Sequence, residues 1–117
     1  MAKKRVAVEF GMGSSLRSED PTAACIRACK DALWHNSLSI AQAFDQTVDD
    51  MIVEVELACQ APDTVDTAEV AKVFPYGRIS VSAKPGGLTI QKPDGAGVTI
   101  IAHAAIIVSL DLPEAKS

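Results

Sequence analysis

The sequence predicts a mixed α/β (α+β) fold with the element order β-α-β-α-β-β and one mixed four-stranded sheet that carries its helices on one face. Two observations predict this class. Runs of alternating apolar and polar residues, typical of half-buried strands, recur along the chain, and a strong helix start follows the first of them. The 117 residues suffice for a single domain over 1–117, with an ordered core at about 4–112.

Alternation predicts the strands in order. The segment "RVAVEF" ends at Gly11, "MIVEVELAC" alternates most clearly, and "LTIQKPDGAGVTI" is typical of a hairpin around Pro93-Asp94-Gly95. The predicted strands are residues 5–10, 51–59, 78–84 and 98–110.

Two helices are expected between these strands. Asp20 is a favourable N-cap and Pro21 a favourable first helical residue, so a helix is predicted to run to Trp34. Its small and apolar residues share one face, whereas Trp34 projects into the polar side, either as a partly covered surface residue or as a subunit contact. A second helix is predicted over 67–74, before Pro75.

Composition excludes several classes of protein. Apolar residues make up 48% and charged residues 22%, as in a folded globular chain. A net charge of −4 argues against a nucleic-acid partner, and no apolar run reaches the roughly 18 to 20 residues of a membrane span. With no visible signal peptide, we expect a cytoplasmic protein without nucleic-acid or membrane partners.

The three cysteines are expected to be small buried thiols. Cys25 and Cys29 lie one helical turn apart, but there is no CxxC spacing and no His near them. No metal site and no cofactor are therefore predicted.

The second face of the predicted sheet mixes charged with apolar residues. It is expected to carry Arg5, Ala7, Glu9, Ile52, Glu54, Glu56, Ala58, Arg78, Ser80, Ser82, Lys84, Thr99, Ile101, His103, Ala105 and Ile107. This is either the solvated face of an open sheet or a face that another subunit covers. Because the last strand is apolar on both faces, we predict an oligomer.

The segment "GMGSSLRSEDPTAA" leads from the first strand into the first helix. Gly11 and Gly13 permit unusual backbone angles, and Arg17 suits a carboxylate or phosphate. It lacks the P-loop and dinucleotide patterns, so it is either a structural turn or a ligand-binding rim formed by Gly11, Gly13, Ser15 and Arg17.

Further site candidates each have a structural alternative. His35 and His103 suit proton transfer, but His35 also suits a helix C-terminus and His103 also suits a packed core. Lys84 is a candidate catalytic residue, and Arg78, Gly86 and Gly87 are candidate ligand-binding residues, although a double glycine is most often a bend. The side chains of Glu54 and Glu56 form either an acid–base pair or ion pairs with Arg78 or Lys84.

Several segments together resemble an uncharacterised family of small bacterial and plant proteins with an N-terminal GxGxDxHG motif. They are "VEFGMGSSLRSEDPTAACIRACKDALWHNS", "PYG", "GG" and "AHAAIIVSL". Gly11 and Gly13 match the motif glycines, but Ser15 replaces its Asp, Arg17 its His and Ser18 its last Gly. Because Arg stays protonated and a lone Ser is a poor ligand, a metal or acid–base role of that pair does not carry over.

The element order also resembles the trimeric AroH-type chorismate mutases and, more weakly, the cyanuric acid hydrolase and barbiturase group. That resemblance implies a trimer around a β-barrel, with clefts for small molecules at the subunit boundaries. The amide hydrolases use Ser and Lys pairs, and Ser82 and Lys84 are two residues apart here.

Two classes of function follow. One is an isomerase- or hydrolase-like subunit that binds a small anionic or cyclic-amide metabolite at subunit boundaries. The other is a non-catalytic partner in a homo- or hetero-oligomer, assembling with an intact paralogue that carries the Asp and His of the motif.

Overall fold

The computed structural model describes residues 2–15, 20–34, 41, 44–93, 95 and 97–112. The elements are β1 (Ala2–Ser15), α1 (Pro21–Trp34), the 3-10 turn η2 (Val48–Asp50), β2 (Ile52–Cys59), the 3-10 turn η3 (Pro62–Thr64), α2 (Thr67–Ala71), β3 (Arg78–Pro85), β4 (Leu88–Gln91) and β5 (Val98–Leu112). Arg17, His35 and the side chain of Trp34 lie outside this description, so the expectations placed on them stay predictions.

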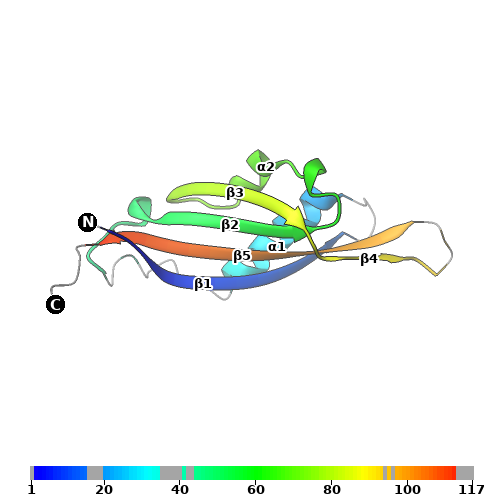
Figure 1. Ribbon diagram of the computed structural model, residues 1–117, viewed down its shortest axis with the longest axis horizontal. Coiled ribbons are helices and arrows are strands. Elements are labelled where there is room, and N and C mark those ends of the chain that lie inside the picture. The colour runs from blue at the N-terminus through cyan, green and yellow to red at the C-terminus, as the bar shows by residue number, and fades with distance from the viewer. Residues whose placement is uncertain are drawn as a thin grey trace.

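The strands form one mixed sheet in the order β1-β5-β2-β3 (Figure 1). β5 is antiparallel to β1 and β2, whereas β3 runs parallel to β2. β4 pairs with the start of β5, so the first arm of the predicted hairpin is a fifth strand. The predicted mixed α/β class is confirmed, and the trimer and barrel, which belong to an assembly, stay predictions.

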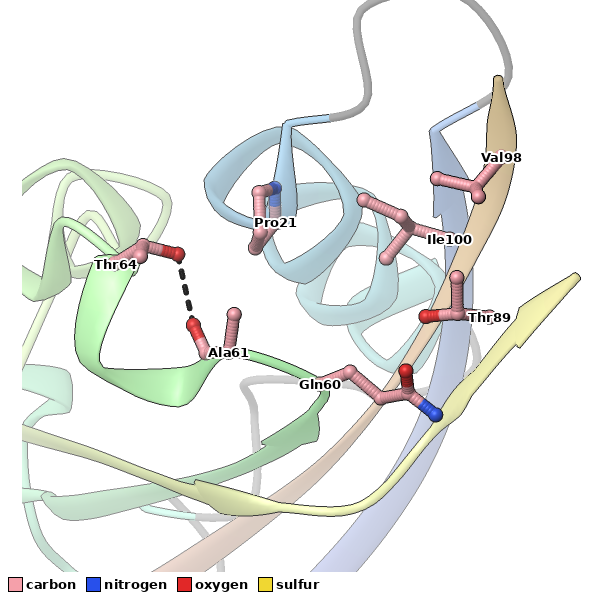
Figure 2. A pocket seen from close by; sticks show the side chains of 7 residues that line it. All are labelled: Pro21, Gln60, Ala61, Thr64, Thr89, Val98 and Ile100. Atoms are coloured by element: carbon pink, nitrogen blue, oxygen red, sulfur yellow. Dashed lines mark hydrogen bonds between the residues drawn. The ribbon is translucent and has the colours of Figure 1, made fainter. Parts of the chain in front are cut away.

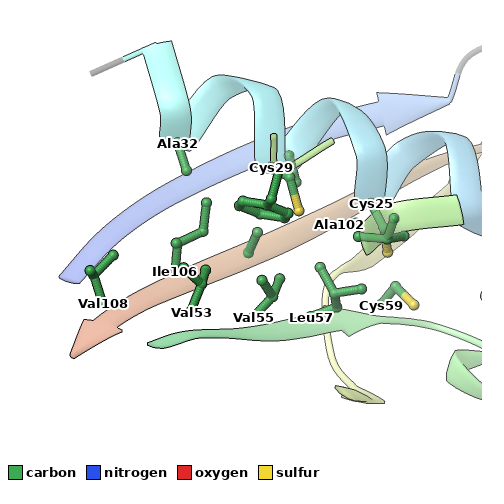
Figure 3. Packing of buried hydrophobic residues seen from close by; sticks show 14 of the residues in the cluster. Cys25, Cys29, Ala32, Val53, Val55, Leu57, Cys59, Ala102, Ile106 and Val108 are labelled. Carbon is green, nitrogen blue, oxygen red and sulfur yellow. The ribbon is translucent and has the colours of Figure 1, made fainter. Parts of the chain in front are cut away.

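The helices supply a single layer on one side of the sheet (Figure 1). Small residues of α1 pack on β1 and β5, and Val70 of α2 closes the core beside them. The apolar residues of β2 and β5 that face this layer are buried: Val53, Val55, Leu57, Cys59, Ile100, Ala102, Ala104, Ile106, Val108 and Leu110. Figure 3 shows several of them beneath α1, among them Val55, Leu57 and Ile106. Neither helix among the described residues is long and apolar enough to cross a membrane.

The starts of the two helices are capped and joined. The Asp20 side chain accepts a hydrogen bond from the Thr22 N–H at 3.0 Å, which confirms the predicted N-cap. Thr22 Oγ1 in turn accepts from the Asp66 N–H at 2.9 Å, and the Asp66 side chain caps α2. α2 ends at Ala71, three residues before the predicted end at 74.

β1 differs most from the prediction. It extends to Ser15, five residues beyond the expected end, and a bulge lies between Arg5 and Ala7. One inserted residue reverses the alternation that follows, so Ala7 and Glu9 lie on the helix side of the sheet. Their predicted place on the second face was therefore wrong, and Phe10 and Met12 occupy that face instead.

Candidate functional site on the open face of the sheet

Gly11 and Gly13 lie within β1, beneath α1, and not in a loop. A Cβ at Gly11 would lie 2.1 Å from the Ala28 carbonyl oxygen, and one at Gly13 would lie 2.3 Å from the Ala28 nitrogen. Only residues without a side chain fit here, because the helix backbone rests directly on the strand. The predicted turn was wrong for these residues, and their observed role is close packing.

Ser15 closes the same segment. Its side chain is buried, and its Oγ accepts a hydrogen bond from the Asp20 N–H at 3.2 Å. Ser15 therefore holds the end of β1 to the start of α1. The predicted rim does not come together as a site in the described residues: Gly11, Gly13 and Ser15 are packing residues, and Arg17 is not described.

The opposite side of the sheet has no helix layer among the described elements, and we call it the open face. Because paired residues share a face, the pairing register assigns its residues. They are Lys3, Arg5, Val8, Phe10, Met12 and Ser14 of β1; Thr99, Ile101, His103, Ala105, Ile107, Ser109 and Asp111 of β5; Ile52, Glu54, Glu56 and Ala58 of β2; Arg78, Ser80, Ser82 and Lys84 of β3; and Leu88 and Ile90 of β4.

Large apolar side chains stand exposed on the open face. Phe10 is 72% exposed, Met12 57%, Ile90 50% and Leu88 49%. They come from β1 and β4, on either side of β5, whose Ile101 lies opposite both Ser14 and Leu88. Contiguous exposed apolar surface of this kind marks interaction sites more often than isolated residues do.

The other half of the open face is more polar, and two of its lysines form ion pairs with the glutamates of β2. Lys84 Nζ lies 3.6 Å from Glu56 Oε2, and Lys3 Nζ lies 2.9 Å from Glu54 Oε1. The expected pairing of Lys84 with the Glu56 side chain is confirmed, whereas Glu54 pairs with Lys3 of β1. The two carboxylates are therefore parts of ion pairs.

His103 lies in the middle of the open face and is exposed, so the alternative of a packed core histidine was wrong. The register places Met12, His103, Ala58 and Lys84 in one row across four strands. His103 and Lys84 thus lie two strand spacings apart, roughly 10 Å, with only the small Ala58 side chain between their strands. Two of the three predicted catalytic residues share a row.

Gly86 and Gly87 adjoin this row, where the chain crosses from β3 to β4. A Cβ at Gly86 would lie 2.8 Å from the Ala58 Cβ, and Gly87 has a φ of +67°. The two glycines let the crossing pass close over the end of β2. The predicted bend is confirmed, and no contact here assigns them a ligand.

Arg78 lies at the far end of β3, six residues from Lys84, and does not join the row. Its neighbour is Asp50. The Thr47 N–H and hydroxyl donate to Asp50 Oδ2, and these hydrogen bonds, with the Arg78 charge, hold the pKa of the Asp50 carboxyl below its ordinary value.

A separate hollow of about 460 Å³ lies on the helix side, where α1 begins (Figure 2). Pro21 and the turn after β2 form one wall, and β4 with the start of β5 forms the other. Gln60 and Thr89 present polar groups to it, while Thr64 Oγ1 is bonded to the Ala61 carbonyl at 2.7 Å. Sequence reasoning missed this hollow, because no motif links residues from four separate elements.

The cysteines are all buried and free, as predicted, and lie between α1 and β2 (Figure 3). Burial raises the pKa of the Cys25 and Cys29 thiols from 9.0 to about 12. The neighbouring Cys59 adds to the rise at Cys25. Among the residues that the structure describes, no three His, Cys, Asp or Glu side chains gather so that they could hold a metal ion.

The chain is similar to one protein family and to a solved structure. A family model described as "conserved hypothetical protein", Lin0512, matches residues 5–108. An FtsZ-like protein of unknown function from Nostoc punctiforme PCC 73102, known from its crystal structure, is 33% identical in sequence to this chain. The two folds match with a TM-score of 0.85. The match covers 95% of this chain and 98% of that chain, and no curated protein matches. The chain therefore belongs to the Lin0512 family of conserved hypothetical proteins.

Proposed function

We propose that the protein is an assembly subunit whose open face packs against the open face of a second copy. The observation that carries this proposal is the exposure of Phe10, Met12, Leu88 and Ile90 on a sheet face that no described element covers. Removing such side chains from water is the main favourable term in most protein association.

The size of the open face suits a partner sheet. The five strands together have 49 residues, which at about 3.3 Å along and 4.8 Å across each strand give the face an area of roughly 800 Å². Each partner of a standard interface buries about 800 Å². The molecule is elongated, 61 Å long against 22 and 21 Å across, so its radius of gyration of 16.2 Å exceeds the roughly 13 Å of a compact chain of this length.

The charges of the open face favour the same occupant. Lys84 with Glu56 and Lys3 with Glu54 are paired within one chain, so covering them requires no charged partner. A second copy presents an equally mixed surface, on which the same two ion pairs form within its own chain. Two such sheets pack face to face with their strands aligned or crossed.

Light scattering at micromolar concentration tests this assembly. Wild-type protein is expected to sediment and scatter as an oligomer, and Phe10→Ser with Met12→Ser is expected to weaken association at least tenfold, about 1.4 kcal/mol. Tyr76→Ser is the matched control, because Tyr76 is 47% exposed but lies in the turn between α2 and β3. A wild-type protein that stays a compact monomer would overturn the proposal, and mixing it with an intact paralogue would then test a hetero-oligomer.

The stoichiometry and location also belong to the proposal. The resemblance to the chorismate mutases implies three copies around a barrel, and sedimentation equilibrium measures that number directly. Three free buried thiols suit a reducing compartment such as the cytoplasm.

A second candidate function is binding of a small anionic or cyclic-amide metabolite at the subunit boundary. It is favoured by the placement of His103 and Lys84 in one row of the open face. Inorganic phosphate and succinimide serve as probes in calorimetric titrations. Binding that His103→Ala and Lys84→Ala weaken, but that Arg78→Ala at the far end of β3 leaves unchanged, would support it; equal binding by all four proteins would refute it.

A further inference from the structure

β1 is an edge strand, paired on one side only, with β5. The free N–H and C=O groups of an edge strand form a template on which another chain can add a strand. In an antiparallel pair, every second residue directs its backbone groups away from the partner strand. Met12 and Ser14 are two successive outward residues of β1, and α1 reaches both of them.

Two side chains of α1 bond these outward groups. The Met12 N–H donates to Asp31 Oδ2 at 3.0 Å, and Arg27 Nη1 donates to the Ser14 carbonyl oxygen at 2.6 Å. Arg27 and Asp31 are four residues apart and therefore lie on the same side of the helix. They offer the edge an acceptor and a donor, as the backbone of an added strand would.

The reach of these side chains depends on the close contact of helix and strand. Asp has a short side chain, so it contacts the Met12 N–H only where the helix lies against β1. Gly11 and Gly13 allow that approach, because any Cβ there would collide with the backbone at Ala24 or Ala28. The glycines and the two charged residues thus form one arrangement along the edge.

We infer that Arg27 and Asp31 block strand addition at Met12–Ser14 and so exclude this part of the β1 edge as an interface. Copies of the chain then associate through the open face and not by extending the sheet past β1, and this second clause rests on the proposed function. Charged side chains at sheet edges limit open-ended association in the same way.

The test is the variant Arg27→Ala with Asp31→Ala, compared with wild type and with Lys30→Ala, an exposed charge on the same helix. Hydrogen exchange of the Met12 amide reports the edge, and sedimentation velocity reports the size of the particles. In freshly diluted samples, the double variant is expected to lose protection at Met12 at least tenfold, because no side chain then bonds that N–H. On longer incubation at high concentration it is expected to form larger species that grow with time. Wild type and Lys30→Ala are expected to keep both properties.

Conservative variants keep the inference testable if the double variant does not fold. Asp31→Asn retains an acceptor and Arg27→Lys retains a donor, so both are expected to preserve protection and size. A folded double variant with wild-type protection at Met12 and wild-type size would overturn the edge block. That conclusion would not depend on how Phe10→Ser changes association through the open face. A monomeric wild type beside a polymerising double variant would uphold the block at this edge and refute the proposed face-to-face assembly.

Discussion

At the scale of single residues, the glycines of β1 have a role that differs from the one their local pattern predicts. After an alternating run, Gly11 and Gly13 predict the end of a strand, because glycine weakens strands and favours turns. The structure uses them for the close approach of α1, whose backbone lies 2.1 Å from an ideal Cβ at Gly11. That reason depends on helix residues 11 or more positions away in the sequence, which local patterns do not reveal.

Gly13→Ala is expected to destabilise the protein by about 3 kcal/mol, the upper end for overpacking, since its Cβ would meet helix backbone at 2.3 and 2.4 Å. Urea denaturation measures the change. Ser14→Ala, one residue further and on the open face, is the control and is expected to stay within about 0.5 kcal/mol. Equal effects of the two substitutions would contradict close packing as the role of Gly13.

The buried thiols predict a loss of stability at alkaline pH. Below pH 9 both Cys25 and Cys29 are protonated whether the chain is folded or not, so their contribution is complete. Between pH 9 and about 12 the unfolded chain releases thiol protons that the folded chain keeps, and the free energy of unfolding falls by up to about 1.4 kcal/mol per pH unit per thiol. In urea titrations, Cys25→Ala with Cys29→Ala is expected to flatten this pH dependence; an unchanged slope would contradict it.

At the scale of elements, α1 was predicted well because its signals are local. Asp20 and Pro21 mark its start, and its small residues recur at helical spacing. The same helix carries Arg27 and Asp31, whose edge contacts were not anticipated, since charged residues on a helix surface are ordinarily solvated. Which exposed charge has a partner is decided by the strand that lies beneath the helix.

Asp20→Ala is expected to lower the free energy of unfolding by on the order of 1 kcal/mol, because the Thr22 N–H loses its acceptor. Thermal denaturation followed by circular dichroism measures the effect. Asp49→Ala, an exposed acidic residue away from both helix starts, is the control. A smaller loss for Asp20→Ala than for Asp49→Ala would show that the cap contributes nothing measurable.

At the scale of the whole molecule, the fold class, the element order and four of the strands could be predicted, because alternation and helix caps depend on residues that are close together in the sequence. Which residues of β1 lie on the open face could not be predicted. The bulge at β1 exchanges the two faces beyond Arg5, and this exchange places Phe10 and Met12 on the open face and removes Glu9 from it. An inserted residue in a strand leaves no mark on composition, so the place of Phe10 and Met12 on the open face was not predicted.

The central position of β5 has a consequence for when the sheet can form during protein synthesis. β1, β2 and β4 all pair with β5, and among the described strands β2 with β3 is the pair that does not need it. A ribosome adds β5 (residues 98–112) after all the other strands, so β1, which is synthesised first, remains longest without its partner strand. Chaperones that bind exposed apolar segments would meet β1 and α1 during that interval. The sheet is completed only when its last strand emerges and fixes its first.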